Sequence, residues 1–234
     1  MTAFTIKIIA ITSMFIDHAG AVFELDIWFR VIGRLAFPLF VYLIAEGCRH
    51  TKSMEKYLLR LGLFALISEI PFDMAFNRGN INFFANTNIF YTLFLGAASV
   101  YAFQYLKSLP NRLFLVFTPV PVLIAAMTAH TFSSDYHYIG VLFIFFTALA
   151  SEYKYLQLLV IALFSFWLYL PGALQTSFAI NPIPLYMLIF CLISIPIVAY
   201  ANGKRGPSAK YLFYVAYPGH LLLFSLIATG FWRL

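Results

Sequence analysis

The sequence predicts an all-α protein, a polytopic membrane bundle of about nine transmembrane helices within a range of roughly eight to ten. Three observations support this fold class. Apolar residues make up 62% of the 234 residues and charged residues 10%, against about 45–50% and roughly 25% in soluble domains. The mean hydropathy is +0.87. Several apolar runs also exceed the roughly 18 residues that suggest a membrane span. These features exclude a secreted or cytosolic globular enzyme and make the lipid bilayer the first expected partner.

Apolar runs that end at turn-forming residues define the expected helices. The run 5–16 resembles the apolar part of a signal peptide, but Asp17-His18 interrupts the approach to Ala19-Gly20-Ala21, so we expect it to remain as a helix. The loops are short, and we expect one domain over residues 1–234. The sixth and seventh runs are short, and form either a broken pair or tilted half-spans. The nine runs are 4–23, 27–47, 56–76, 83–106, 112–128, 138–150, 155–170, 179–200 and 211–231.

The basic residues of the loops follow the positive-inside rule if the N-terminus is cytoplasmic. One basic residue, Arg78, then lies in an outside loop, and Arg233 lies at an outward C-terminus. We therefore expect a multi-pass protein of the inner cell membrane with this orientation. The inside loops carry nine basic residues, Arg49, Lys52, Lys56, Lys107, Arg112, Lys154, Lys204, Arg205 and Lys210.

The remaining composition argues against several kinds of partner. The net charge is +6, but no basic stripe alternates with aromatic residues, so we expect no nucleic-acid partner. Cys48 and Cys191 lie in or near apolar runs, without the Cys/His spacing of a zinc site. We interpret both as packing residues and expect no metal.

Polar side chains inside the predicted helices occur at comparable depth. Each charge at this depth costs about 2.5–3.5 kcal/mol on insertion scales, so such residues usually pair or face a cavity. We expect the first four helices to converge on one polar chamber in the outer half of the membrane, with Asp135-Tyr136 in a loop over its mouth. The chamber residues are Asp17, His18, Arg30, Arg34, Glu69, Asp73 and Asn88.

Helical spacing predicts how these residues pair. Arg30 and Arg34 are four residues apart and share a face. Asp17 and His18 are consecutive and point about 100° apart. We therefore expect Asp17 or Asp73 to pair with Arg34, while His18 points elsewhere into the chamber. The alternative for such a pair is a purely structural role, in which it only ties two helices together.

Two prolines inside the predicted helices predict helix breaks. Pro218-Gly219 precedes His220, which either faces the chamber or contacts a neighbouring carbonyl at a kink. Pro71 lies between Glu69 and Asp73 in the third helix. Broken helices are common at transport sites, so a transporter or permease that uses the buried charges is the alternative function.

Ordered motifs along nearly the whole chain resemble those of the TraX family of membrane proteins. They are FIDH at 15–18 with Gly20, IGRLAFPLF at 32–40, AEG at 45–47, SEIPFD at 68–73, NIFYTL at 88–93 with Gly96, DY at 135–136 with Gly140, and YP at 217–218 with His220. This family includes a pilin acetylase and looks like a branch of the wider transmembrane acyltransferases. The resemblance implies an enzyme that transfers acetyl from acetyl-CoA to a hydroxyl or amine.

The resemblance also implies roles for the polar residues. It makes His18 the general base, which suits an imidazole that titrates near 6.5 when unperturbed. The expected catalytic group is His18, Asp17, Arg34 and Asp73, and the expected substrate-binding group is Arg30, Glu69, Asn88, Asp135, Tyr136 and His220.

The donor would meet basic residues on the cytoplasmic side. We expect the phosphates of coenzyme A at Arg49, Lys52 and Arg60 together with Lys56, or at Lys204 and Arg205. The extracytoplasmic acceptor stays open between a pilin amine, a polysaccharide hydroxyl and a lipid-linked sugar. A third function, a structural helper in assembling a surface appendage, needs neither transport nor acetyl transfer.

Overall fold

The computed structural model describes residues 1–77, 79–175, 181–208 and 210–229, and these residues form helices and loops with no strand. Arg78 and Arg233, used above to orient the chain, lie outside the described residues, as do Ala179 and Phe231, the outer limits of two predicted helices. The elements form two compact units. Unit 1 contains Met1–Leu43, Ile70–Ile81 and Leu158–Leu234, and unit 2 contains Ile44–Glu69 and Asn82–Gln157.

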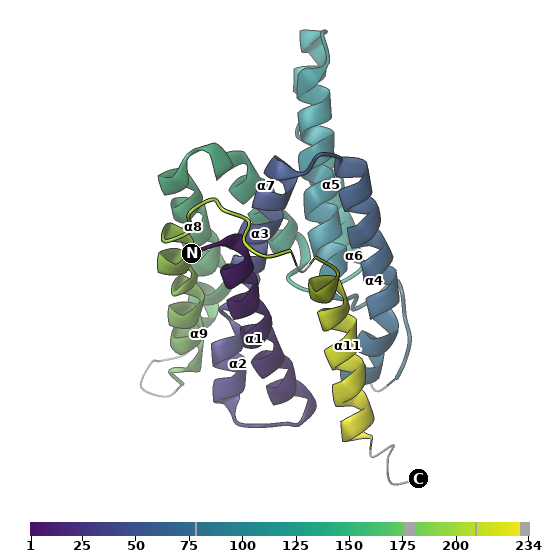
Figure 1. Ribbon diagram of the computed structural model, residues 1–234, viewed down its shortest axis with the longest axis vertical. Helices are drawn as coiled ribbons and strands as arrows, with labels where there is room; N and C mark the ends of the chain where they lie inside the picture. The colour runs from purple at the N-terminus through teal and green to yellow at the C-terminus, as the bar shows by residue number, and fades with distance from the viewer. Residues whose placement is uncertain (78, 176–180, 209, 230–234) are drawn as a thin grey trace. The chain divides into compact units, whose positions relative to one another are not determined.

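Unit 1 is built around the first helix (Figure 1). Helix α1 packs against α2 and α11, and α2 packs against α9. The helices wholly within this unit are α1 (Ala3–Val22), α2 (Ile27–Gly33), α9 (Ile183–Leu192), α10 (Ser194–Ala199) and α11 (Lys210–Ala228).

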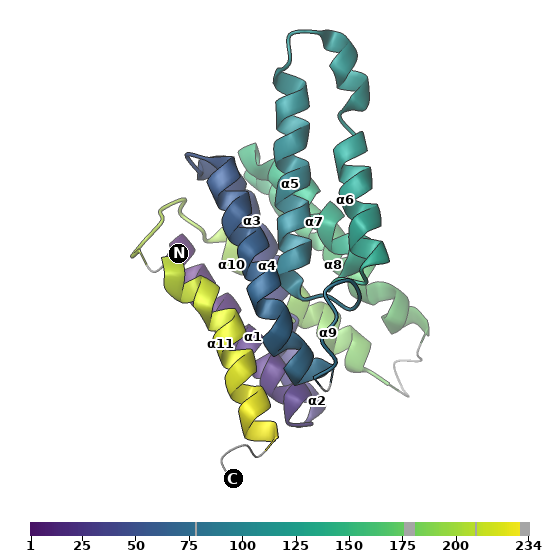
Figure 2. The ribbon, with the colours of Figure 1, turned by 90° about the vertical axis from the view of Figure 1, so that its right-hand side faces the viewer.

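Unit 2 has three mutually packed helices, α5, α6 and α7, of which α5 and α6 lie side by side in Figure 2. Its helical elements are α5 (Ile89–Ser108), η1 (Arg112–Phe117), α6 (Val120–Thr131), α7 (His137–Leu149) and η2 (Ala150–Glu152). Three helices contribute residues to both units, α3 (Ala36–His50), α4 (Met54–Phe76) and α8 (Lys154–Gln175).

The all-α membrane fold is confirmed. The eleven α-helices of the described residues follow the nine predicted runs, because two runs, 27–47 and 179–200, each contain two α-helices. Four segments are long and apolar enough to cross a membrane, namely Ala3–Val22, Ile27–His50, Ile89–Ser108 and Lys154–Gly172. The chain is a multi-pass membrane protein, whereas its organisation as a single domain stays a prediction.

The predicted helix 27–47 is divided at Arg34-Leu35 into α2 and α3. Pro38 explains the division, because proline has no N–H to bond the carbonyl of Arg34 four residues earlier, and its ring collides with that carbonyl in a continuous helix. The break places Arg34 at the C-cap of α2, where its side chain is at the junction of two helices.

The prediction of helix breaks at Pro71 and at Pro218-Gly219 is wrong. Helix α4 continues through Pro71, and α11 continues through Pro218 and Gly219. Neighbouring packing can hold a proline-containing helix together in a membrane protein. The broken helices that favoured a transport site are therefore absent at these positions.

The first turn of α1 is closed by a distant loop of unit 1. The amides of Ala3 and Phe4 donate to the carbonyls of Lys204 and Arg205 at 2.9 and 3.1 Å. Gly206 has φ +73°, and a Cβ there would lie 2.7 Å from the Thr2 hydroxyl oxygen. Helix N-termini carry amides without intrahelical partners, so this loop caps the helix.

Candidate functional site

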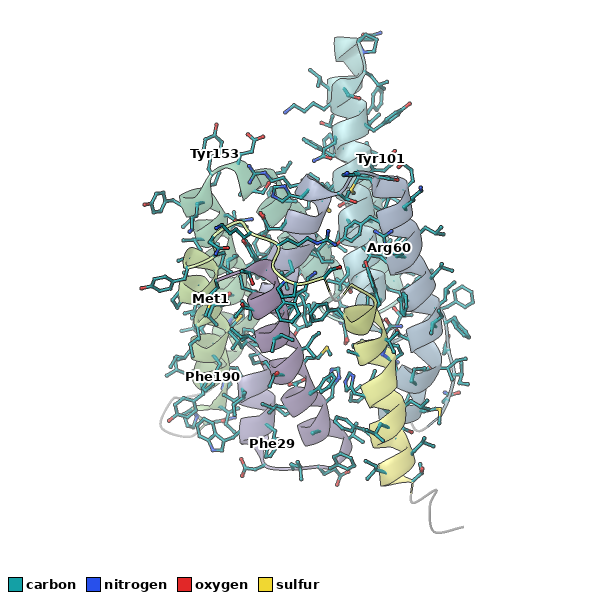
Figure 3. The ribbon with its side chains drawn as sticks, viewed as in Figure 1. Met1, Phe29, Arg60, Tyr101, Tyr153 and Phe190 are labelled. Atoms are coloured by element: carbon teal, nitrogen blue, oxygen red, sulfur yellow. The ribbon has the colours of Figure 1, made fainter. Side chains whose placement is uncertain are left out.

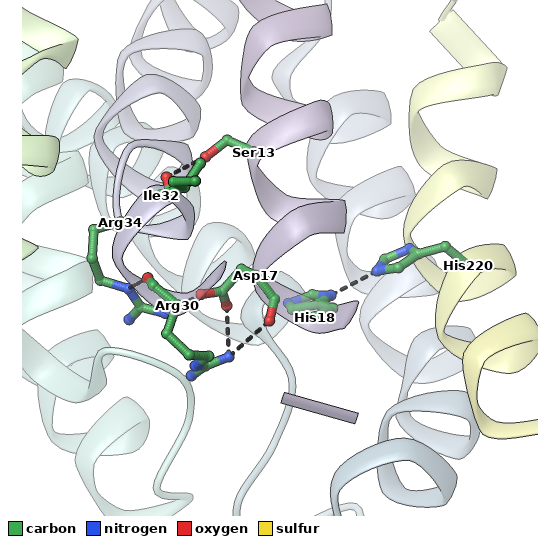
Figure 4. Close-up of polar contacts among 7 residues, drawn as sticks. All are labelled: Ser13, Asp17, His18, Arg30, Ile32, Arg34 and His220. Carbon is green, nitrogen blue, oxygen red and sulfur yellow. Dashed lines mark hydrogen bonds and ion pairs between the residues drawn. The ribbon is translucent and has the colours of Figure 1, made fainter. Parts of the chain in front are cut away.

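Asp17, in the last turns of α1, accepts from two arginines of unit 1, and we call Asp17, Arg30 and Arg34 the carboxylate–arginine cluster (Figure 4). The Arg30 guanidinium donates to Asp17 Oδ2 at 2.8 Å and to the Asp17 carbonyl at 3.3 Å. Arg34 donates to Asp17 Oδ1 and, through Nε, to the Arg30 carbonyl at 2.9 Å. One buried carboxylate thus holds two cations from α2 and its C-cap.

Close contact between α1 and α2 makes this cluster possible. The Ser13 hydroxyl donates to the Ile32 carbonyl at 2.8 Å. Gly33 leaves room for the Asp17 side chain, because a Cβ at position 33 would overlap the carboxylate. The structure thereby pairs Asp17 with Arg34, one of the two acids expected for it, and adds Arg30, which spacing alone did not assign to Asp17.

His18 points away from its neighbour Asp17 and contacts His220 of α11, and we call these two residues the histidine pair (Figure 4). His18 Nδ1 and His220 Nε2 are 2.6 Å apart. His220 Nδ1 is 2.7 Å from the Ala216 carbonyl oxygen. His220 is 5% exposed, whereas His18 is partly exposed. The contact with a carbonyl was foreseen for His220, but the contact with His18 was not.

Aromatic side chains surround the histidine pair within unit 1. Phe15 stacks on His220 with ring centroids 4.3 Å apart. Phe76, at the end of α4, presents an edge contact to His18 at 5.3 Å. Tyr217 contacts both imidazoles. The pair therefore lies in mainly apolar surroundings, next in sequence to the carboxylate–arginine cluster.

In unit 2, Asn88 and Glu69 form a buried polar contact. Asn88 Nδ2 donates to Glu69 Oε2 at 2.5 Å and to the Ala65 carbonyl at 2.8 Å, and its amide N–H donates to the same carboxylate oxygen at 3.2 Å. Asn88 Oδ1 accepts from the Phe90 amide at 2.9 Å. Asn88 therefore caps α5 and fastens its start to α4.

The predicted helical start at residue 83 is wrong, because α5 begins at Ile89. Asn88 is its N-cap rather than a residue inside the helix. The preceding segment contains Asn82, whose side chain accepts from the Phe84 amide at 3.0 Å. Such local side-chain bonds compete with helix formation.

Asp73 lies near the C-terminal end of α4 in unit 1. Its side chain accepts from Asn77 Nδ2 at 2.5 Å, and its carbonyl accepts from the amides of Asn77 and Gly79 at 3.0 and 2.9 Å. The carboxylate is buried. These contacts organise the chain where it leaves the helix.

The predicted loop residues Asp135 and Tyr136 lie in a strained connection before α7. Ser133, Tyr136 and His137 all have positive φ, at 48°, 62° and 46°. Such conformations cluster at functional sites, where the surrounding structure maintains them. The loop is fixed to the start of α5, since the Asp135 amide donates to the Thr87 carbonyl at 3.1 Å. The backbone of Asp135 is thus placed beside Asn88.

The basic residues predicted for coenzyme A differ in their surroundings. Arg49 donates to the Ser151 carbonyl at 2.8 Å, and Lys52 is exposed. Arg60, labelled on α4 in Figure 3, lies over the ring of Tyr57 at 5.9 Å from the centroid. Within the described ranges, no group of three His, Cys, Asp or Glu residues is arranged to hold a metal ion.

The polar residues therefore form separate sets within the two units. Unit 1 has the carboxylate–arginine cluster, the histidine pair and Asp73, and unit 2 has Glu69, Asn88, Asp135 and Tyr136. Their convergence on one chamber stays a prediction. Chemically, the partly exposed imidazole of His18 can accept a proton, and the cluster beside it carries cationic hydrogen-bond donors.

Comparison with known proteins places these motifs in a family. A curated relative, named "Probable fimbrial assembly protein FimC, serogroup H1" from Dichelobacter nodosus, is 29% identical over 240 residues, which cover 95% of this chain and 93% of the relative. No solved structure matches. The family model described as "TraX protein" matches residues 3–228, and the chain thus belongs to the TraX family.

Proposed function

We propose that this protein is a membrane acetyltransferase that moves an acetyl group from acetyl-CoA to an acceptor outside the cytoplasm. The single observation that carries the proposal is His18, a partly exposed imidazole in an apolar helix, held by His220 and adjacent to a cationic cluster. A base of this kind is what acyl transfer to a hydroxyl or amine requires. The family resemblance supplies the identity of the donor.

In this proposal the charged residues have distinct roles. Asp17 fixes the two guanidinium groups, and Arg34, whose side chain is 14% exposed, mainly holds that arrangement. Arg30, at 34% exposed, is the better placed of the two to meet substrate and stabilise a developing oxyanion. Asp73 stays a candidate catalytic residue, and Glu69, Asn88, Asp135, Tyr136 and His220 stay candidates for contact with the acceptor.

The two substrates approach from opposite sides of the membrane in this proposal. The loop charges support a cytoplasmic N-terminus, which leaves Arg49, Lys52 and Arg60 on the cytoplasmic side to bind the phosphates of coenzyme A. Arg49 and Arg60 already have protein contacts, so Lys52 is the freest of the three to move toward a phosphate.

The relative's name supports an acceptor on a surface appendage. Fimbriae are built from pilin subunits, so the α-amine or a side-chain hydroxyl of a pilin is the first acceptor to test. Polysaccharide and lipid-linked sugar acceptors present the same hydroxyl chemistry and form the second panel.

The test compares acetyl-CoA binding and coenzyme A release by purified wild type, His18→Ala and the matched control His130→Ala in detergent. His130 is an exposed histidine in the last turn of α6, outside the proposed machinery. We expect saturable binding by all three proteins and slow release of free coenzyme A that only His18→Ala loses. Undiminished release by His18→Ala would overturn the assignment of the base. Absence of acetyl-CoA binding by the folded wild type would overturn the proposed donor.

A further inference from the structure

The hydrogen bonds of the histidine pair determine where its protons are. A backbone carbonyl has no proton to donate, so the 2.7 Å contact with Ala216 requires a proton on His220 Nδ1. A neutral imidazole carries one ring proton. Nε2 of a neutral His220 is therefore an acceptor.

The same rule applies to the next contact. His18 Nδ1, 2.6 Å from His220 Nε2, must then be the donor. A neutral His18 has no further ring proton, and its Nε2 carries a lone pair. The order of hydrogen bonds from Ala216 through His220 to His18 thus selects one tautomer of His18.

The surroundings favour a neutral pair. Phe15, Phe76 and Phe224 contact its rings and provide no counter-charge. The nearby carboxylate of Asp17 already accepts from both Arg30 and Arg34, so it is not a counter-charge available to the pair. A cationic imidazole would be a poorly compensated charge in mainly apolar surroundings.

We infer that His220 is a positioning residue that holds His18 in the tautomer with a proton on Nδ1 and a basic Nε2. This inference rests on the proposed function for its role in turnover. In the reaction, His18 Nε2 takes the proton of the acceptor O–H or N–H while the acceptor atom bonds to the acetyl carbon. The thioester C–S bond breaks, and the leaving coenzyme A thiolate receives that proton from Nε2. His18 Nδ1 keeps its proton throughout.

Nitrogen NMR of the full chain in nanodiscs, labelled with ¹⁵N-histidine, reads the tautomer directly and without acetyl transfer. Single-histidine variants assign the signals. We expect wild-type His18 to be protonated at Nδ1. His220→Leu removes the acceptor and should move His18 toward the Nε2-protonated form, whereas His220→Gln offers a side-chain oxygen as acceptor and should retain the wild-type form.

Kinetics then tests the positioning role. We expect His220→Leu to lower kcat for acetyl transfer about 10- to 100-fold, less than the roughly 10²–10⁴-fold that a general base itself contributes, with the KM for acetyl-CoA unchanged. His220→Gln should recover most of the loss, which a packing defect would not predict, since Leu suits apolar surroundings better than Gln.

The outcomes separate this inference from the proposed function. A proton on Nε2 of wild-type His18 overturns the inference whatever the activity. Equal kcat for His220→Leu and wild type overturns the positioning role. An Nδ1 proton in a protein that binds no acetyl-CoA supports the tautomer and overturns the proposed function. Because His220→Leu could unfold the protein, the wild-type spectrum alone keeps the tautomer assignment falsifiable.

Discussion

The carboxylate of Asp17 lies against the backbone of Gly33 so closely that a Cβ atom at position 33 would overlap it. The same carboxylate accepts from Arg30 and Arg34. The absence of a side chain at position 33 of α2 therefore permits the close approach of α1 and α2 at which Asp17 meets both arginines.

Gly33→Ala should displace Asp17 and leave the two guanidinium groups without full compensation. We expect a loss of about 2–4 kcal/mol in the free energy of unfolding, somewhat less than for a fully buried pair because Arg30 retains access to water. Thermal unfolding in detergent measures it through maleimide-dye labelling of Cys48 and Cys191, which are both buried. Gly219→Ala is the matched control, since nothing lies within 4 Å of its added Cβ. Equal stability of the two variants would contradict the close contact.

The two arginines of the cluster should contribute unequally. The Arg34 side chain is 14% exposed and that of Arg30 is 34% exposed, so water compensates less when the pair with Arg34 is lost. We expect Arg34→Gln to cost about 2–3 kcal/mol and Arg30→Gln about 1 kcal/mol. The same dye assay ranks them. In an Asp17→Asn background both costs should shrink, because each substitution then removes an uncompensated cation. A larger loss for Arg30→Gln than for Arg34→Gln would contradict the prediction that the more buried arginine contributes more stability.

Asn88 and Glu69 should tolerate an exchange of roles. Asn88→Asp keeps the oxygen that caps α5 but sets two carboxylates together, and we expect a loss of about 2–4 kcal/mol. Adding Glu69→Gln supplies an amide donor to the new carboxylate and should recover at least half of that loss, although the Ala65 carbonyl still loses its donor. A double-mutant cycle of unfolding free energies measures the coupling. Purely additive effects would show that the contact contributes nothing specific.

Gly96 should be required for α5 to pack on α7. A Cβ at position 96 would lie 2.7–2.9 Å from three side-chain atoms of Ile144. Gly96→Ala should cost about 1–3 kcal/mol through overpacking. Gly62→Ala on α4 is the control, because its nearest neighbour is a Phe94 ring atom at an ordinary 3.5 Å. Dye-monitored unfolding should show a loss of stability for Gly96→Ala and a neutral or slightly stabilising effect for Gly62→Ala.

Much of this architecture follows from patterns along the chain. Apolar runs and turn residues located the helical segments, because lipid requires long apolar helices with all backbone groups bonded. The pair between Asp17 and Arg34 was one of two predicted options, since buried charge needs a partner. At these positions, patterns in the sequence were sufficient to predict the helices and to limit the partners of Arg34.

The positions that escaped prediction depend on tertiary contacts. The chain is divided into two helices near Pro38, whereas α4 continues through Pro71 and α11 continues through Pro218. Only the packing around each proline distinguishes these cases. Asn88 is the N-cap of α5. The asparagine-rich segment before it is typical of a loop, but the apolar residues around it predicted a helix from residue 83. The contact between His18 and His220 joins residues 202 positions apart, which no local pattern encodes.

The capping of α1 by the loop at residues 204–206 has a consequence for biosynthesis. The first helix emerges from the ribosome long before Lys204 and Arg205, the residues whose carbonyls accept from its Ala3 and Phe4 amides. During translation those amides depend on water or lipid headgroups at the membrane surface. The N-terminus of α1 is thus completed only after all the residues between it and Lys204 have been made.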